Sequence, residues 1–277
     1  MSDRAFSVLP QRGLVRLSGD DVKALLQRLI TTDMDIVERD GVGFGALLTP
    51  QGKILFDFII AQSDADLWVD LPRAVVGDFI KRMTLYKLRA DVTLTDCSDS
   101  HEVCVAPEGV APDGDVVALF SDPRAEGLGL RLFRSAKGGE EDTGHWQERR
   151  IALGVPEVSS DFGYGDLFPH DAGMDHLNGL VFDKGCYVGQ EVVSRMHHRG
   201  TARKRPVIVR GAGLSEGAEL MGGDKSVGIL GYVSGDHAVA IARLDRLKSA
   251  LDNGAEISVA GAPVEVSLPQ WAGYDWP

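Results

Sequence analysis

The sequence has few cysteines and no long hydrophobic run. Its three cysteines, Cys97, Cys104 and Cys186, are spread over 277 residues, and none forms the CxxC pair of a redox or zinc site. The most apolar stretch, residues 54–61, is interrupted by Asp57 and is far shorter than the roughly 20 residues of a membrane span. The first ten residues lack the hydrophobic region of a signal peptide. These absences predict a reduced, cytoplasmic protein that makes no membrane contact.

Positive charge is also scarce. The chain has 29 Lys and Arg against 41 Asp and Glu, for a net charge of −12, and 44% of its residues are hydrophobic. This balance is typical of a soluble globular protein and disfavours one that coats nucleic acid. No glycine-rich nucleotide-binding motif follows a strand pattern, so the nucleotide-binding folds have no support.

The first half of the chain alternates helix and strand patterns. Apolar residues at helical spacing predict helices over residues 22–30 and 75–86. The turn sequence of residues 49–52 predicts a hairpin into residues 53–61, and strands are expected at 67–71, 92–95, 103–106 and 128–133. We therefore expect a compact α+β unit over about residues 48–135, ended by the polar segment 135–144.

From residue 206 onward the pattern changes to short β-prone pieces separated by glycine-rich turns. Strands are expected at 207–210, 227–233, 238–244, 257–260 and 264–268, with a helical insert at 244–251. Strands at this spacing predict a small closed or sandwiched β-domain.

Chemistry-bearing residues concentrate at residues 178–191, around Cys186. Gly185 and Gly189 flank the thiol and are expected to let the backbone bend sharply. A helix expected to begin near Glu191, together with Lys184, would favour the reactive thiolate form. The alternative is a small, buried, inert cysteine. One thiol cannot complete a four-thiolate cluster site, so no resident metal is predicted and any cluster contact needs a partner.

A basic segment directly follows, over residues 195–205. It holds five cations and no acid, namely Arg195, Arg199, Arg203, Lys204 and Arg205. Such a segment in an acidic chain predicts a local site for one anion, such as a carboxylate tail or a phosphate. The alternative is an exposed linker. The adjacent His197 and His198 have poor spacing for a metal pair, and a Cys–His hydrolase built with His170 or His176 is disfavoured because nothing fixes its geometry.

The octapeptide of residues 184–191, Lys-Gly-Cys-Tyr-Val-Gly-Gln-Glu, resembles the signature Lys-Gly-Cys-(Tyr/Phe)-x-Gly-Gln-Glu of the YgfZ family. These are folate-binding proteins of iron–sulfur cluster assembly. The match is complete, and residues 19–33, 48–53, 83–96, 150–156 and 168–175 resemble other parts of the family. The resemblance therefore extends along the whole chain.

The resemblance implies an α+β fold, the three-domain cloverleaf of the aminomethyltransferase folate-binding type with a C-terminal small β-barrel. The domains would be residues 1–47 with 145–203, an inserted ferredoxin-like unit at 48–136, and the barrel at 204–277. It further implies a tetrahydrofolate ligand and a role in assembly or repair of 4Fe–4S clusters, with iron–sulfur assembly proteins and client proteins as partners. Cys186 would be the functional thiol. The residues expected to bind folate or shape the loop are Lys184, Gly185, Tyr187, Gly189, Gln190, Glu191 and Asp175.

Two alternatives remain open. A folate-dependent one-carbon transferase would share the fold, but the region that resembles the transferase motif carries Asp70 in place of Asn and Asp78 one position out of register. That departure argues against aminomethyl transfer, because the expected catalytic carboxylate would be missing. An RNA-binding module using the basic segment is disfavoured by the net charge. If the resemblance to the YgfZ family holds, the basic segment would meet the glutamate tail of folate or an acidic partner.

Overall fold

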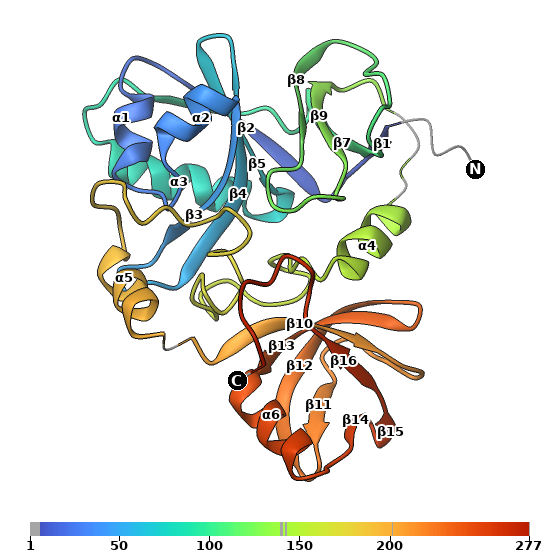
Figure 1. The fold of residues 1–277 in the computed structure, drawn as a ribbon. Helices are drawn as coiled ribbons and strands as arrows, with labels where there is room; N and C mark the ends of the chain where they lie inside the picture. The colour runs from blue at the N-terminus through green and yellow to red at the C-terminus, as the bar shows by residue number, and fades with distance from the viewer. Residues whose placement is uncertain (1–5, 139–140, 142, 201, 277) are drawn as a thin grey trace.

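Three antiparallel sheets, connected through a long irregular segment, make up the molecule (Figure 1). The computed structural model describes residues 6–138, 141, 143–200 and 202–276. No helix within these ranges is long and apolar enough to cross a bilayer. Two of the sheets lie side by side in the upper part of Figure 1, and the third lies below them.

The first sheet has five strands in the order β3-β4-β5-β2-β6. They are β2 (Arg12–Ser18), β3 (Val42–Leu48), β4 (Ile54–Ser63), β5 (Asp66–Pro72) and β6 (Thr93–Asp96). Three helices, α1 (Val22–Gln27), α2 (Met34–Asp40) and α3 (Val76–Lys87), share one hydrophobic core with this sheet, and the short 3-10 helix η1 (Arg73–Val75) precedes α3. Phe56 and Phe58 of β4 belong to that core, whereas Ile59 and Ala61 belong to the core on the opposite face. Alternate residues of a strand point to opposite faces, so β4 is buried on both.

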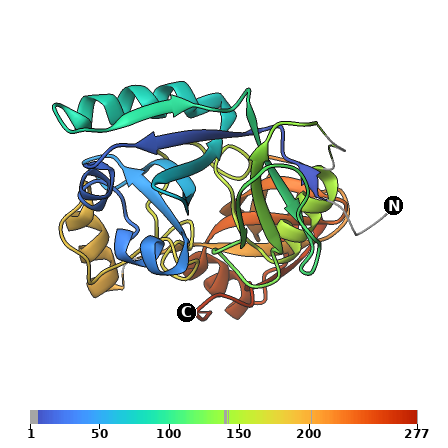
Figure 2. The ribbon, with the colours of Figure 1, turned by 90° about the horizontal axis from the view of Figure 1, so that it is seen from above.

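The second sheet has four strands in the order β1-β7-β9-β8. They are β1 (Ser7–Val8), β7 (His101–Ala106), β8 (Val116–Ser121) and β9 (Leu130–Ser135). Seen from above, this sheet lies beside the first, and α3 runs along one outer edge of the molecule (Figure 2). Residues 48–136, expected as one inserted unit, therefore contribute strands to two sheets. The hydrogen bonds between β3 and β4 also cross the expected boundary at residue 48, with Leu47 opposite Phe56.

The lower part of the molecule is the C-terminal sheet. Helix α4 (Thr143–Ala152), an irregular segment over residues 153–189 and helix α5 (Gln190–Arg199) lead into it. Its strand order is β15-β14-β11-β12-β13-β10-β16. The strands are β10 (Lys204–Arg210), β11 (Glu219–Gly222), β12 (Lys225–Ser234), β13 (His237–Arg243), β14 (Ile257–Val259), β15 (Ala262–Pro263) and β16 (Glu265–Ser267), with α6 (Leu244–Asp252) after β13. The C-terminal tail returns to the irregular segment, where the Trp271 indole donates to the Leu153 carbonyl at 2.8 Å.

The sequence patterns predicted several regular elements and missed others, among them the buried strand β2 and the helix α4. The hairpin through residues 49–53, helix α3, the helical insert α6 and five C-terminal strands are confirmed. Helix α2 was missed because it has only seven residues. Its end signals are present, since the Asp33 cap accepts from the Asp35 amide and Gly41, with φ of 78°, ends the helix. Strand β8 was missed because its side chains are exposed or half-buried and give no clear alternation.

Candidate functional site

Residues 183–189, which we call the thiol loop, connect the irregular segment to α5. Asp183, Gly185 and Cys186 are exposed, whereas Lys184 and Tyr187 on either side of them are buried. The buried neighbours anchor the loop at two points. The Cys186 thiol is thereby presented to solvent from a loop with fixed flanks, so the alternative of a buried cysteine is wrong, and the reactivity of the thiol stays a prediction.

Lys184 is buried and directed at the backbone of a neighbouring segment, and its expected effect on the thiol stays a prediction. Its ammonium donates to the Ile30 carbonyl at 2.8 Å and also to the Thr32 carbonyl. The same nitrogen lies 5.5 Å from the centre of the Tyr187 ring. Burial lowers the pKa of Lys184 to about 8. The side chain therefore fastens the loop to the segment between α1 and α2, and its charge is directed to backbone oxygens.

Gly189 explains how the loop packs against the hairpin turn. It has φ of 81°, and a Cβ there would lie 2.8 Å from the Thr49 carbonyl oxygen. Gly52 in the turn has φ of 82°, and a Cβ on it would lie 2.9 Å from Cβ of Val192. Each position needs glycine for its conformation and for the close approach. The turn and the thiol loop, about 140 residues apart in the chain, are held together by these two glycines.

The other loop residues contribute less than the octapeptide suggested. Gly185 has no positive φ, and a Cβ there would meet open space, so the sharp bend expected at this glycine is absent. Gln190 begins α5, as expected for the helix after the thiol, and Glu191 is exposed in its first turn. Within the described ranges, no group of three His, Cys, Asp or Glu side chains is arranged to hold a metal ion.

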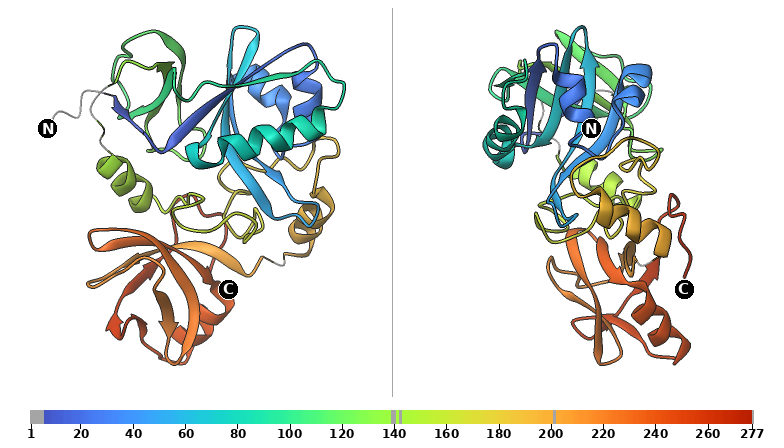
Figure 3. Two further views of the ribbon diagram at one scale, coloured as in Figure 1. Left: turned by 180° about the vertical axis from the view of Figure 1, so that it is seen from behind. Right: turned by 90° about the vertical axis from the view of Figure 1, so that its left-hand side faces the viewer.

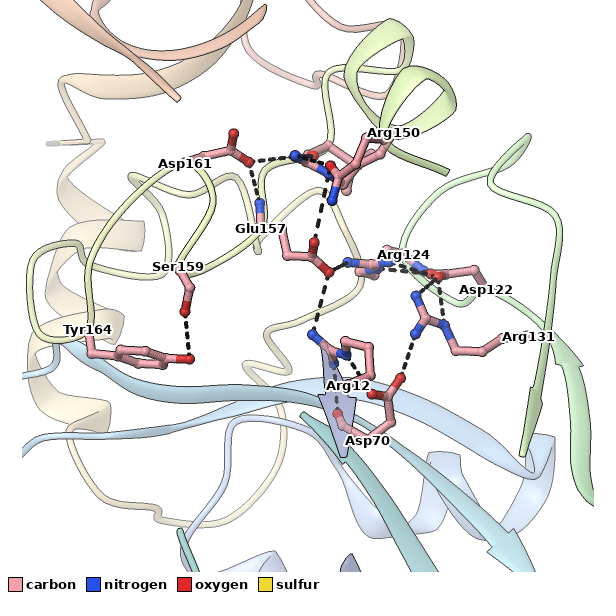
Figure 4. Close-up of polar contacts among 12 residues, drawn as sticks. Arg12, Asp70, Asp122, Arg124, Arg131, Arg150, Glu157, Ser159, Asp161 and Tyr164 are labelled. Atoms are coloured by element: carbon pink, nitrogen blue, oxygen red, sulfur yellow. Dashed lines mark hydrogen bonds and ion pairs between the residues drawn. The ribbon is translucent and has the colours of Figure 1, made fainter. Parts of the chain in front are cut away.

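A second feature, which the sequence patterns did not predict, is a buried ionic network between the sheets (Figure 4). Arg12 at the start of β2 donates from Nε to Asp70 of β5 at 2.6 Å. Arg131 of β9 donates to the other Asp70 oxygen at 2.5 Å and to Asp122 at 3.0 Å. Arg124 binds the same Asp122 carboxylate at 2.8 and 2.9 Å. The network therefore joins the first sheet to the second.

The network continues toward the C-terminal sheet. Glu157 accepts from Arg12 at 3.4 Å, and Arg150 of α4 lies 3.9 Å from it. Arg150 also pairs with Asp161, whose other oxygen accepts from the Tyr232 amide of β12 at 3.0 Å. Burial disfavours the charged form of Asp122, but Arg124 and Arg131 outweigh it and hold the pKa of Asp122 below its usual range. The network thus connects all three sheets through paired charges.

Asp57 of β4 lies beside this network but is not paired within it. Its Oδ1 atom is buried and has no hydrogen-bond partner among the described residues. Burial raises the pKa of Asp57 to about 6, against the opposing effect of Arg12 and Arg124. The indole nitrogen of Trp146 on α4 is also buried without a partner, and the Arg124 guanidinium lies 5.5 Å from the Trp146 ring. Two unsatisfied polar atoms beside one ionic network are unusual in a folded interior and make this region a candidate place for a polar ligand.

This arrangement changes the reading of the two carboxylates singled out in the sequence. Asp78 is exposed on α3 and lies 3.4 Å from Lys81, and Asp70 is fully paired inside the network. The buried carboxylate with a free oxygen is Asp57, which sequence reasoning did not select. Its signal was visible, because it is the one charged residue inside the apolar run of residues 54–61.

The basic segment is not assembled into one cationic site. Arg205 is buried and makes a bidentate pair with Asp175 at 2.7 and 3.0 Å, so neither side chain is available as expected. Arg195 and Arg199 are exposed on α5, and Arg203 and Lys204 are exposed after it. A cleft of about 370 Å³ is lined by Arg203 and Arg205, but also by Asp175, Asp245 and Asp275. An anion site at this segment stays a prediction, with a lining of mixed charge.

His170 lines the same cleft and is a buried imidazole without a partner. Both of its ring nitrogens lack hydrogen bonds within the described ranges, and its ring centre lies 6.0 Å from that of Phe182. Burial lowers the pKa of His170 to about 4, although Asp175 opposes the shift. The imidazole is therefore neutral at physiological pH.

We expect His170→Phe to remove a pH-dependent loss of stability. Between pH 6.5 and 4 the unfolded state binds a proton that the folded wild-type imidazole does not, so stability falls on acidification by about 3 kcal/mol. Urea unfolding of both proteins at pH 7 and pH 4 measures this, because every other titrating group cancels in the difference. An equal loss in the two proteins would show that His170 accepts its proton in the folded state.

Comparison with solved structures identifies the arrangement of the three sheets. The glycine cleavage system aminomethyltransferase T from Bartonella henselae matches with a TM-score of 0.73 at 13% identity, over 96% of this chain and 86% of that chain. The chain has the aminomethyltransferase fold. The fold class expected from the octapeptide is therefore confirmed. At this identity the aminomethyltransferase fold says nothing about activity.

Sequence comparisons find relatives that are named as iron–sulfur cluster assembly factors. Residues 203–274 match the family model described as the CAF17 C-terminal beta-barrel domain. The mitochondrial iron–sulfur cluster assembly factor IBA57 of Homo sapiens is 27% identical over 309 residues, covering 97% of this chain and 84% of that protein. The IBA57 homolog of Mycosarcoma maydis is 31% identical over 222 residues, covering 72% of this chain and 55% of that protein, so the chain spans about half of that relative. Both relatives are named as iron–sulfur cluster assembly factors, and membership of this chain in the YgfZ family stays a prediction.

Proposed function

We propose that this protein is an accessory factor for the assembly or repair of 4Fe–4S clusters, acting through Cys186. The observation that carries the proposal is the exposed thiol on a loop whose flanking residues, Lys184 and Tyr187, are buried. A thiolate is a ligand for iron, but one thiolate supplies only one of the ligands that a cluster needs. The cluster is therefore cargo held jointly with a partner protein, and the fixed loop presents the thiol to that partner. The relatives named as iron–sulfur cluster assembly factors support this reading.

We propose that tetrahydrofolate binds in the region around Asp57 and Trp146, beside the buried ionic network. The unpartnered Asp57 oxygen and Trp146 indole nitrogen supply one acceptor and one donor beside the ionic network. A reduced pterin carries amide and amino groups along one edge, so it offers the complementary donors and acceptors. These residues fit such a group, and their part would be to bind and orient its polar edge.

We expect tetrahydrofolate to bind the wild-type protein measurably in calorimetry and to bind Asp57→Asn at least about tenfold more weakly. The reason is the loss of a charge-assisted hydrogen bond worth about 1.5–3 kcal/mol. The matched control is Asp78→Asn, an exposed carboxylate that should leave binding unchanged. Absence of binding heat at high micromolar ligand would refute the folate proposal.

The same substitution has an opposite effect on the empty fold. The folded pKa of Asp57 is about 6 against an ordinary value of 3.8, so the wild type loses stability as pH rises through this window. Asp57→Asn avoids that loss and should be more stable than wild type at pH 8, by about 3 kcal/mol. Weaker ligand binding in a more stable protein cannot be attributed to misfolding.

A folate-dependent one-carbon transferase is the second candidate. Asp57 favours it, because a buried carboxylate with a pKa of about 6 is suited to proton transfer near neutral pH. Formaldehyde release or consumption in the presence of tetrahydrofolate separates the two functions. Turnover that is lost in Asp57→Asn and retained in Cys186→Ser would identify a transferase. The assembly factor is identified instead if no formaldehyde turnover is found in vitro and the activity of 4Fe–4S enzymes in cells depends on Cys186.

A further inference from the structure

The turn after α3 holds a leucine in a conformation and an exposure that both disfavour leucine. Leu88 has φ of 49° and ψ of −105°, and the turn is closed by the Ala90 amide donating to the Lys87 carbonyl at 2.8 Å. These angles are those of the first central position of a type II′ turn, where glycine is preferred. The Leu88 side chain is nevertheless 83% exposed. Backbone strain of this kind concentrates at functional sites, so this turn is a candidate functional surface.

The surrounding contacts keep this turn in place. The Lys87 ammonium donates to the Val92 carbonyl at 2.6 Å, and the Val92 amide donates to the Ala90 carbonyl at 2.9 Å. The Asp91 amide donates to the Asp21 carboxylate at 2.8 Å. Because the turn is fastened at both ends, its strained residue cannot relax into another conformation, and Leu88 stays directed outward.

The neighbours of Leu88 define a small amphipathic surface, which we call the Leu88 tip: Arg82, Leu85, Leu88 and Arg89. Leu85 is 69% exposed. Arg82 and Arg89 are exposed, and neither makes an ion pair with any residue that the structure describes. Arg82 and Leu85 are three residues apart on α3 and so share one side of the helix, and Leu88 and Arg89 follow in the turn beyond its end at Lys87. Nearby Lys81 differs, since it lies 3.4 Å from Asp78. In a chain with a net charge of −12, two unpaired arginines beside two exposed leucines form a surface that is complementary to an acidic and apolar partner segment.

The Leu88 tip also lies on the same side of the molecule as the thiol loop. Figure 1 places the C-terminal end of α3 and helix α5 at its left-hand side. The right-hand view of Figure 3, taken from that side, shows α5 facing the reader and α3 end-on at the edge. One partner approaching from this side is able to meet both.

We propose that the Leu88 tip docks an acidic and apolar segment of the partner protein that meets Cys186. The proposal rests on the assembly function given above and adds the surface and the chemistry of its partner. Carboxylates of the segment pair with Arg82 and Arg89, and its apolar side chains cover Leu85 and Leu88. The strain at Leu88 is offset only in the complex, where the side chain leaves water.

The first test separates docking from folding with Leu88→Gly. Glycine relieves the strained turn, so the melting temperature should stay equal or rise, while 4Fe–4S enzyme activity in cells carrying this variant as their sole copy should fall at least about fivefold. The double variant Arg82→Glu with Arg89→Glu should show the same loss. The matched control is Leu251→Ser, another leucine with 46% exposure, on α6. Full activity in Leu88→Gly would overturn the proposal.

The second test identifies the occupant. A photoreactive benzoylphenylalanine at position 88 should cross-link in cells to a peptide that carries both acidic and apolar residues. The yield should drop at least about tenfold when Arg82 and Arg89 are reversed in charge. Cross-links to a second copy of this chain or to lipid, or none above the level of the same probe at position 251, would overturn the proposal.

The two proposals fail separately. If Cys186→Ser abolishes cluster-dependent activity and Leu88→Gly does not, the docking surface is refuted and the thiol role stands. If Leu88→Gly abolishes it and Cys186→Ser does not, the thiol role is refuted and the docking surface stands.

Discussion

Asp70→Asn should lower the free energy of unfolding by about 3–5 kcal/mol, the largest stability effect that we expect from a single side chain of near-identical shape. Asp70 is fully buried and pairs with both Arg12 and Arg131. Neutralising it leaves two buried guanidiniums without their shared counter-charge. Breaking one member of a buried ion network is costly for this reason, even where replacing the whole network by apolar residues is not.

Urea unfolding at pH 7 measures the effect, and the melting temperature should fall by about 10 °C. Asp78→Asn is the matched control, because its partner Lys81 is exposed and such pairs contribute at most about 1 kcal/mol. If Asp70→Asn unfolds within about 1 kcal/mol of the wild type, water or rearranged acids compensate the arginines, and the network is not what joins the first two sheets.

Cys186→Ser should reduce the activity of 4Fe–4S enzymes in cells by roughly an order of magnitude, because a serine hydroxyl stays protonated and is a poor ligand for iron. The side chain is exposed and makes no hydrogen bond within the described part of the chain, so the free energy of unfolding should change by less than about 0.5 kcal/mol. The enzymes are assayed in cells whose only copy of the protein carries the substitution.

Cys97→Ser is the matched thiol control. Cys97 is buried at the end of the first sheet, where its thiol packs in a hydrophobic core. We expect this variant to lose stability while keeping the cluster-dependent activity per folded molecule. Undiminished enzyme activity with Cys186→Ser would contradict the thiol role, whatever the outcome of the folate experiments.

Several elements were predictable because their signals are local. The α3 helix repeats apolar residues at helical spacing, and the 49–52 turn has the proline and glycine of a hairpin. The octapeptide identified Cys186, and the structure places that thiol at the surface. The contacts of Lys184 were not predictable, because no sequence pattern reveals that its flexible side chain reaches the Ile30 and Thr32 carbonyls.

By itself, the sequence determined the fold class, the C-terminal β-domain and the loop that carries the thiol. Only the tertiary structure decided that Asp57 is the free buried carboxylate, that Arg205 is bound to Asp175, and that a network of arginines and acids joins the sheets. The physical reason is the separation in sequence over which each kind of interaction acts. Periodicity and turn chemistry act over a few residues, whereas an ion pair such as Arg12 with Glu157, 145 residues apart, exists only after the chain has brought distant segments together.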